Sequence, residues 1–216
     1  MAKINRKSVR IIAHPEVWAL KYGKLEANNA DKYEYRYVGI PFRKEMLESL
    51  GADFDLTPKP TWLTDDIVAS GEEPMTTTYE SVTEKAVKKT ANGYEQDDLP
   101  DDQSLYIRTD LGLVIIMGCA HRGMINIINH ARKLMEEERV YMVLGGTHLV
   151  SASKHQLDST IEDLKKINSR WIGVSHCTGL MVSTVLANEF GDKFFFNNAG
   201  TILKFPYDGT DGSMVG

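Results

Sequence analysis

Three histidines of this 216-residue chain share one setting, in which an imidazole directly follows a short apolar segment. Each segment is rich in β-branched and aliphatic residues and ends in glycine or another small residue. Such runs predict buried strands, so each imidazole is expected at the carboxyl end of a strand. The three segments end at His121, His148 and His176.

The recurrence of this setting favours a shared metal site over three separate structural roles. A single strand-end histidine is more often a hydrogen-bonded structural residue than a ligand. Three of them, each beside small residues that let the backbone approach a bound group, favour a common ligand. Because neutral imidazole is the commonest protein ligand of borderline divalent metals, we predict a divalent ion here. Zinc is the first expectation, with manganese or iron as alternatives.

The two cysteines of the chain, Cys119 and Cys177, lie close to the candidate ligands. A thiol nucleophile needs a base placed beside it in space, whereas neighbouring residues on a strand point to opposite faces. We therefore expect both cysteines to be small buried fillers, with a thiol enzyme as the alternative.

Four further residues are candidates for positioning the ligands or binding substrate. Asp101 and Asp102 precede a predicted strand, where they could orient the metal ligands or simply solvate a turn. Thr178 and Gly179 precede a predicted helix and could cradle an anion at its amino end. The remaining histidines lack the strand-end setting and are expected to be structural or exposed.

The elements that must position these residues are regular from residue 101 onward. Apolar runs and helical periodicity alternate three times, which implies a sheet with helices packed on it. Asp158 or Ser159 is available to cap the second helix. The predicted strands are 104–109, 112–117, 140–144, 171–174, 194–196 and 201–205, the first two forming a hairpin, and the predicted helices are 123–138, 156–168 and 180–190.

Residues 24–100 are irregular by comparison and rich in charged and turn residues. We expect them to form a strand-and-loop wall or lid. A strand at 8–13 and a helical turn at 16–22 precede this region, and within it only 33–38 and 67–69 read as strands and 43–50 as a helix.

Composition limits the classes of partner. A length of 216 residues with 42% hydrophobic residues suits a single domain. The net charge of −5 leaves no basic footprint for nucleic acid. No apolar stretch approaches the roughly 20 residues of a membrane span, and no signal peptide is recognisable. A cytoplasmic protein with a small-molecule substrate is expected.

Four ordered motifs carry a resemblance to a known superfamily. They are Asp-Asp-Gln-Ser-Leu at 101–105, Gly-Cys-Ala-His-Arg-Gly at 118–123, Gly-Gly-Thr-His-Leu at 145–149 and Ser-His-Cys-Thr-Gly at 175–179. Together they resemble the C-terminal part of the metallo-β-lactamase superfamily, over roughly Val9 to Phe205. Within it they most resemble the branch of metal-dependent hydrolases and dihydropterin–aminobenzene ribofuranosyl phosphate synthases. The resemblance implies an α+β fold, the αββα sandwich, with a mixed sheet and helices packed on it.

The resemblance also implies roles for the histidines. His121 matches the third-motif ligand of the superfamily and His176 the last histidine ligand, whereas His148 stands where many members place a bridging aspartate. The implied function is that of a metal-dependent hydrolase-like protein, in which metal-bound water acts on an ester, phosphoester or pterin-type substrate.

The chain departs from the superfamily at its amino end, because a His-x-His-x-Asp-His motif is absent from the sequence. We therefore expect one metallo-β-lactamase-like domain, 1–216, that lacks the first half of the sandwich. Three imidazoles could still hold one ion with an open position. The alternative is a non-catalytic truncated remnant, or a subunit that needs a partner chain to complete the site. An apolar face and an unpaired edge would favour a homo-oligomer or a partner chain that covers the missing half.

Overall fold

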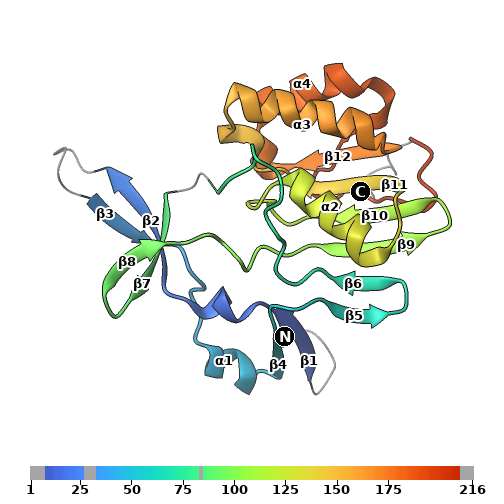
Figure 1. Cartoon of the computed structure of the whole chain (residues 1–216). Helices are drawn as coiled ribbons and strands as arrows, with labels where there is room; N and C mark the ends of the chain where they lie inside the picture. The colour runs from blue at the N-terminus through green and yellow to red at the C-terminus, as the bar shows by residue number, and fades with distance from the viewer. Residues whose placement is uncertain (1–7, 27–32, 83–84, 210–216) are drawn as a thin grey trace.

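The centre of the protein is a seven-stranded mixed sheet with the strand order β13-β12-β11-β10-β9-β6-β5. The computed structural model describes residues 8–26, 33–82 and 85–209 (Figure 1). The strands of this sheet are β5 (Thr61–Thr64), β6 (Ile67–Ala69), β9 (Leu105–Thr109), β10 (Gly112–Ile116), β11 (Val140–Gly146), β12 (Trp171–Ser175) and β13 (Phe194–Phe196).

Strands β10 to β13 run parallel, which places their carboxyl ends at one edge of the sheet. Val143 of β11 pairs with Ile115 of β10 and with Ile172 of β12. All seven residues of β11 are buried, as expected for a central parallel strand covered on both faces. The sequence prediction of these strands is confirmed, as is the β9–β10 hairpin.

Three helices cover one face of this sheet (Figure 1). They are α2 (Met124–Met135), α3 (Lys154–Ile167) and α4 (Leu180–Phe190). Each contributes buried residues to one core cluster, such as Ile127 and Ile128 of α2, Leu164 of α3 and Leu186 of α4. Short 3₁₀ turns follow the strands or helices at η2 (Leu149–Ser151), η3 (His176–Thr178) and η4 (Gly191–Lys193).

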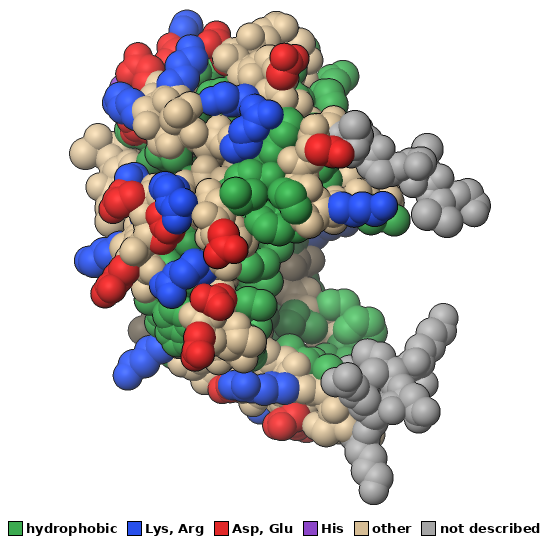
Figure 2. Space-filling view, turned by 90° about the vertical axis from the view of Figure 1, so that its right-hand side faces the viewer, with side chains coloured by type: hydrophobic (Ala, Val, Ile, Leu, Met, Phe, Trp, Pro, Cys, Tyr) green, Lys and Arg blue, Asp and Glu red, His purple; other side chains and the backbone are tan. Residues whose placement is uncertain are grey.

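A second, smaller cluster lies on the opposite face of the sheet. Met142, Trp171 and Phe195 pack there against Tyr207, and the Tyr141 hydroxyl donates to the Tyr207 carbonyl at 3.0 Å. The segment after β13 therefore covers part of this face. Figure 2 shows hydrophobic side chains gathered over the middle of one side of the molecule, next to a hollow.

The amino-terminal region contains more strands than expected. A four-stranded antiparallel sheet of order β3-β2-β7-β8 stands apart from the main sheet (Figure 1). The parallel pair β1-β4 and two short helical segments complete the region. These elements are β1 (Val9–Ala13), η1 (Pro15–Trp18), β2 (Lys21–Glu26), β3 (Tyr33–Tyr37), α1 (Lys44–Ser49), β4 (Ala52–Leu56), β7 (Ala86–Thr90) and β8 (Gly93–Gln96).

Three local predictions are wrong. The helical turn expected over 16–22 ends at Trp18, because the backbone from Lys21 is extended and pairs with β3 and β7. Ser153 caps α3 by accepting from the Gln156 N–H at 3.1 Å, in place of the predicted Asp158 or Ser159. The segment 201–205 forms no strand, since Leu203 packs against the second cluster instead.

None of the helices in the described part of the chain is long and apolar enough to cross a membrane.

Candidate metal centre

The three predicted histidines lie just beyond adjacent parallel strands. His121 is in the loop between β10 and α2, His148 is two residues beyond β11, and His176 directly follows β12. Parallel pairing of these strands brings the three loops to the same edge of the sheet. The rings of His121 and His148 are neighbours, with 4.3 Å between their centroids.

His176 lies against the two cysteines. Its Nε2 is 2.9 Å from Cys119 Sγ, and its Nδ1 is 3.1 Å from the Ser175 hydroxyl. The donor atoms of Cys119, His176 and Cys177 all lie within 4.8 Å of one another, and theirs is the one group of at least three such donors found among the described residues. The structure thus pairs His121 with His148 and groups His176 with the thiols. The metal-ligand role of the three histidines stays a prediction.

The expectation that the cysteines are small buried fillers is wrong. Both are partly exposed, and both face His176. The alternation of side chains along a strand does not apply to these cysteines, because Cys119 follows the end of β10 and Cys177 lies in η3.

The backbone around the histidines adopts conformations that side chains seldom tolerate. Ala120, directly before His121, has a φ of 56°, and His148 itself has a φ of 49°. Non-glycine residues in this left-handed region are uncommon, and such strain gathers at functional sites. The close approach at Gly146 is more demanding. A Cβ there would lie 2.5 Å from His176 Cε1 and 2.6 Å from Cys177 Sγ.

Of the two predicted positioning carboxylates, Asp102 contacts the loop that carries His121. It accepts the backbone N–H of Arg122 at 3.4 Å and that of His121. Burial raises the pKa of Asp102, and the charge of His121 and these two N–H groups oppose the rise. Asp102 therefore ties the His121 loop to the loop before β9.

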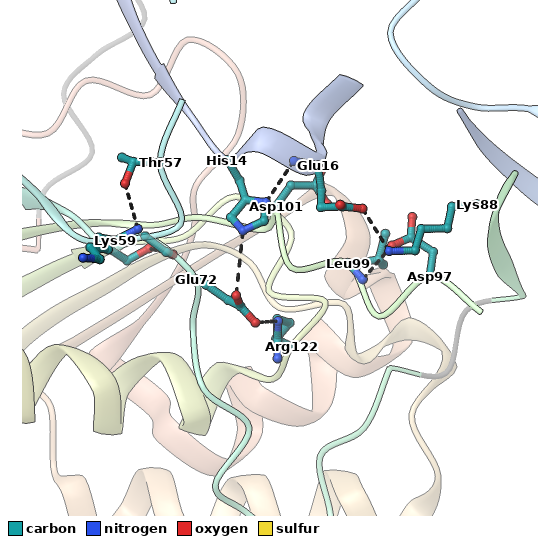
Figure 3. A network of polar contacts seen from close by, with 12 residues as sticks. His14, Glu16, Thr57, Lys59, Glu72, Lys88, Asp97, Leu99, Asp101 and Arg122 are labelled. Carbon is teal, nitrogen blue, oxygen red and sulfur yellow. Dashed lines mark hydrogen bonds and ion pairs between the residues drawn. The ribbon is translucent and has the colours of Figure 1, made fainter. Parts of the chain in front are cut away.

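Asp101 belongs to a different part of the polar network. It pairs with the buried Lys21, whose ammonium also lies 3.1 Å from Asp97. Figure 3 shows Asp97 and Asp101 near a second group of contacts, in which Glu72 accepts from Arg122 at 2.9 Å and lies 3.8 Å from His14 Nε2.

Thr178 and Gly179 are placed at the start of α4, as predicted. The Thr178 side chain is buried, and its hydroxyl forms a 3.0 Å hydrogen bond with that of Thr147. Neither Thr178 nor Gly179 is among the residues that line the cavity next to the histidines. Anion binding by this helix start stays a prediction.

The cavity has a volume of about 1030 Å³ and lies between the four-stranded sheet and the carboxyl edge of the main sheet. Cys119, His121 and His176 lie on its wall on the main-sheet side. The charged residues that line it are Lys21, Lys24, Lys85, Asp97, Asp101 and Asp102. The rest of the lining is largely apolar, and an apolar pocket with a few charged groups is typical of a small-molecule site.

Sequence reasoning missed a buried carboxyl behind the site. Glu73 is fully buried and accepts from the Tyr106 hydroxyl at 3.0 Å. Burial, together with the charge of Asp102, raises the pKa of Glu73 to about 8. No motif surrounds Glu73, so its burial could not be read from the sequence.

Comparisons with known proteins place the chain in a family. No family model matches it. The chain is 31% identical to a protein of Methanocaldococcus jannaschii named 7,8-dihydropterin-6-methyl-4-(β-D-ribofuranosyl)-aminobenzene-5′-phosphate synthase, over 95% of this chain and 69% of that protein. It is also 31% identical to an uncharacterised protein of the same organism, over 90% of this chain and 67% of that protein.

The fold matches a solved structure. The crystal structure of a metal-dependent hydrolase of the β-lactamase superfamily superimposes with a TM-score of 0.76 at 23% identity, over 92% of this chain and 72% of that one. The mixed sheet with helices on one face is thus the metallo-β-lactamase-like fold expected from the motifs. The chain belongs to the family of the archaeal dihydropterin–aminobenzene ribofuranosyl phosphate synthase, and its fold is metallo-β-lactamase-like.

Proposed function

We propose that this protein is a metal-dependent enzyme of the hydrolase type, which acts on a phosphate-bearing ester or pterin-type substrate. The observation that carries the proposal is the group of histidine and cysteine side chains at the strand ends, beside a cavity of about 1030 Å³. A similar protein is named as the synthase of a 5′-phosphate and a structural neighbour as a metal-dependent hydrolase, which agrees with this assignment.

The residues present fit a divalent ion by their chemistry. His121 and His148 lie with adjacent rings, and His176 and His121 line the cavity, so imidazole donors are available at its wall. His121 and His148 would hold the ion, with zinc as the first expectation, and His176 would join them by turning away from Cys119. When bound, a divalent ion acts as a Lewis acid towards a carbonyl or phosphoryl oxygen.

Two lysines supply positive charge for the substrate. The Lys24 N–H donates to the Lys85 carbonyl at 2.7 Å, so the two residues are adjacent on the cavity wall. Lys21, which also lines the cavity, pairs with Asp97 and Asp101. The side chains of Lys24 and Lys85 would add positive charge on the cavity wall, which suits a substrate phosphate.

Asp102 positions the loop that carries His121, and Glu73 is buried behind Asp102. Asp102 holds the His121 loop through two backbone N–H groups, and its position keeps the imidazole at the cavity. With its pKa raised to about 8, Glu73 stays protonated near neutral pH and adds no negative charge behind Asp102.

A second candidate function is that of a subunit whose site is completed by another chain. It is favoured by the group of Cys119, His176 and Cys177, whose three donors leave a coordination position that another chain could fill. In that case the purified protein would bind metal weakly and turn over no substrate until a partner is added.

Metal analysis with matched variants tests the proposal. The purified chain is expected to hold about one divalent ion and to hydrolyse phosphomonoester or phosphodiester probes. His121→Ala and His148→Ala should lose the hydrolysis and bind zinc more weakly, whereas His155→Ala, on the exposed surface of α3, should behave like wild type in both assays. Protein that binds no zinc, manganese or iron on titration would overturn the assignment.

A further inference from the structure

Two thiols and one imidazole converge at the strand ends in a way that the predicted trihistidine site does not account for. Cys119 comes from the loop after β10, and His176 and Cys177 come from the turn after β12. Their donor atoms lie within 4.8 Å of one another, and 2.9 Å separates Cys119 Sγ from His176 Nε2.

These spacings approach those of a metal site. Bond lengths of about 2.3 Å to sulfur and about 2.0 Å to nitrogen place the donors of a tetrahedral zinc ion roughly 3.5–3.8 Å apart. All three side chains are at least partly exposed, which leaves them room to adjust to that spacing.

The surrounding backbone holds the thiols in position. The His148 N–H donates to Cys177 Sγ at 3.3 Å, and Cys177 Sγ donates to the Cys119 carbonyl at 3.4 Å. Gly146 lets the group approach the end of β11, since a Cβ there would meet both His176 and Cys177.

We propose that Cys119, His176 and Cys177 form a sulfur-rich metal site of their own, which takes zinc or another thiophilic ion. This inference deepens the proposed function, because His176 is shared with the predicted trihistidine site. Two thiolates and an imidazole select a softer ion than carboxylate and water ligands do. Binding releases one proton from each thiol to solvent, so two thiolates balance the charge of a divalent ion.

The open side of the site faces the cavity. Cys119 and His176 both line it, so a fourth ligand can enter from the substrate side. Three protein ligands with one open position are typical of catalytic rather than structural zinc.

Cobalt substitution tests the site on the full chain without reference to activity. Cobalt(II) added to the reduced protein is expected to give an intense thiolate-to-cobalt charge-transfer absorption. Cys119→Ser and Cys177→Ser should each weaken this band, and the double variant should abolish it. His121→Ala should keep it, because His121 belongs only to the trihistidine set.

Two outcomes of the cobalt experiment overturn the inference. One is cobalt bound without charge-transfer absorption. The other is an unchanged spectrum in the double cysteine variant. If the band is absent while stoichiometric metal still depends on His121 and His148, the sulfur site fails and the proposed function stands. The rate of alkylation of the two thiols, measured with and without zinc, gives an independent readout. Bound zinc is expected to slow alkylation at least tenfold. Equal rates would contradict the proposal.

Discussion

At the scale of single residues, the burial of Glu73 couples stability to pH. Its pKa in the folded protein is raised to about 8 from the ordinary 4.5, mainly by desolvation. The folded state therefore keeps a proton that the unfolded state releases between these two values. As the unfolded state binds fewer protons, the contribution of Glu73 to stability falls as the pH rises from about 4.5 to 8.

Glu73→Gln should remove this dependence. The amide keeps the shape of the protonated carboxyl but cannot ionise. As the pH rises from 5 to 7, the free energy of unfolding of the wild type should therefore fall by on the order of 3 kcal/mol relative to that of the variant. Urea unfolding at both pH values measures the difference. Glu45→Gln, in an exposed part of α1, is the control and should follow the wild-type profile. Equal pH profiles for Glu73→Gln and wild type would contradict the account.

Gly146 should be sensitive to substitution because it lies against the site residues themselves. Gly146→Ala puts a methyl group 2.5 Å from His176 Cε1 and 2.6 Å from Cys177 Sγ, which forces both side chains to move. A loss of about 1–3 kcal/mol in the free energy of unfolding is expected, together with weaker metal binding. Gly23→Ala meets only ordinary contacts at 3.8 Å or more and is the control. The site geometry would be wrong if both variants bound metal like wild type.

At the scale of elements, the sequence predicted the strands that are buried on both faces. Strands β10, β11 and β12 consist of apolar runs, so their composition predicts their burial. Strands β7 and β8 could not be predicted in this way. The residues of β8 are all exposed and those of β7 are mostly partly buried, and both strands are extended because β7 pairs with β8 and with β2, which composition does not reveal.

The site residues could likewise be predicted only where a recognisable strand precedes them. The three histidines were predicted because each follows a recognisable strand, and the structure does place them at one sheet edge. The grouping of His176 with Cys119 was not predicted, since the loops that bring them together have no periodicity. Only tertiary structure shows which donors face each other.

The start of α3 gives an element-scale prediction. Ser153 caps the helix by accepting the Gln156 N–H, whereas Asp158 pairs with the exposed Lys154. Ser153→Ala should lower the free energy of unfolding by about 1 kcal/mol. Asp158→Ala should lower it by only a few tenths of a kcal/mol, because exposed ion pairs contribute little. Thermal or urea unfolding of the two variants measures the difference. A larger loss for Asp158→Ala would show that the cap is misassigned.

At the scale of the whole molecule, the face of the sheet opposite the helices is only partly covered. Phe205 packs edge-on against Tyr141 but is 55% exposed, and Ile116 at the end of β10 is 37% exposed. We propose that this face mediates self-association, because apolar patches of this kind mark interaction sites.

Light scattering at micromolar concentration tests the association. A mass of twice 24.3 kDa is expected for wild type, and Phe205→Ser should shift the equilibrium towards monomer. The matched change on the helical side is Met181→Ser, which should have no effect although Met181 is 80% exposed. A monodisperse wild-type monomer would contradict the proposal.

The most direct test of the metal centre is anomalous diffraction from crystals of the zinc-loaded full chain, recorded on both sides of the zinc absorption edge. A peak is expected at the carboxyl ends of β10, β11 and β12, about 2.0–2.3 Å from imidazole nitrogen or thiolate sulfur. The donors would come from His121, His148, His176, Cys119 or Cys177. A fully loaded crystal with its zinc elsewhere, or with no peak at this edge, would contradict the account.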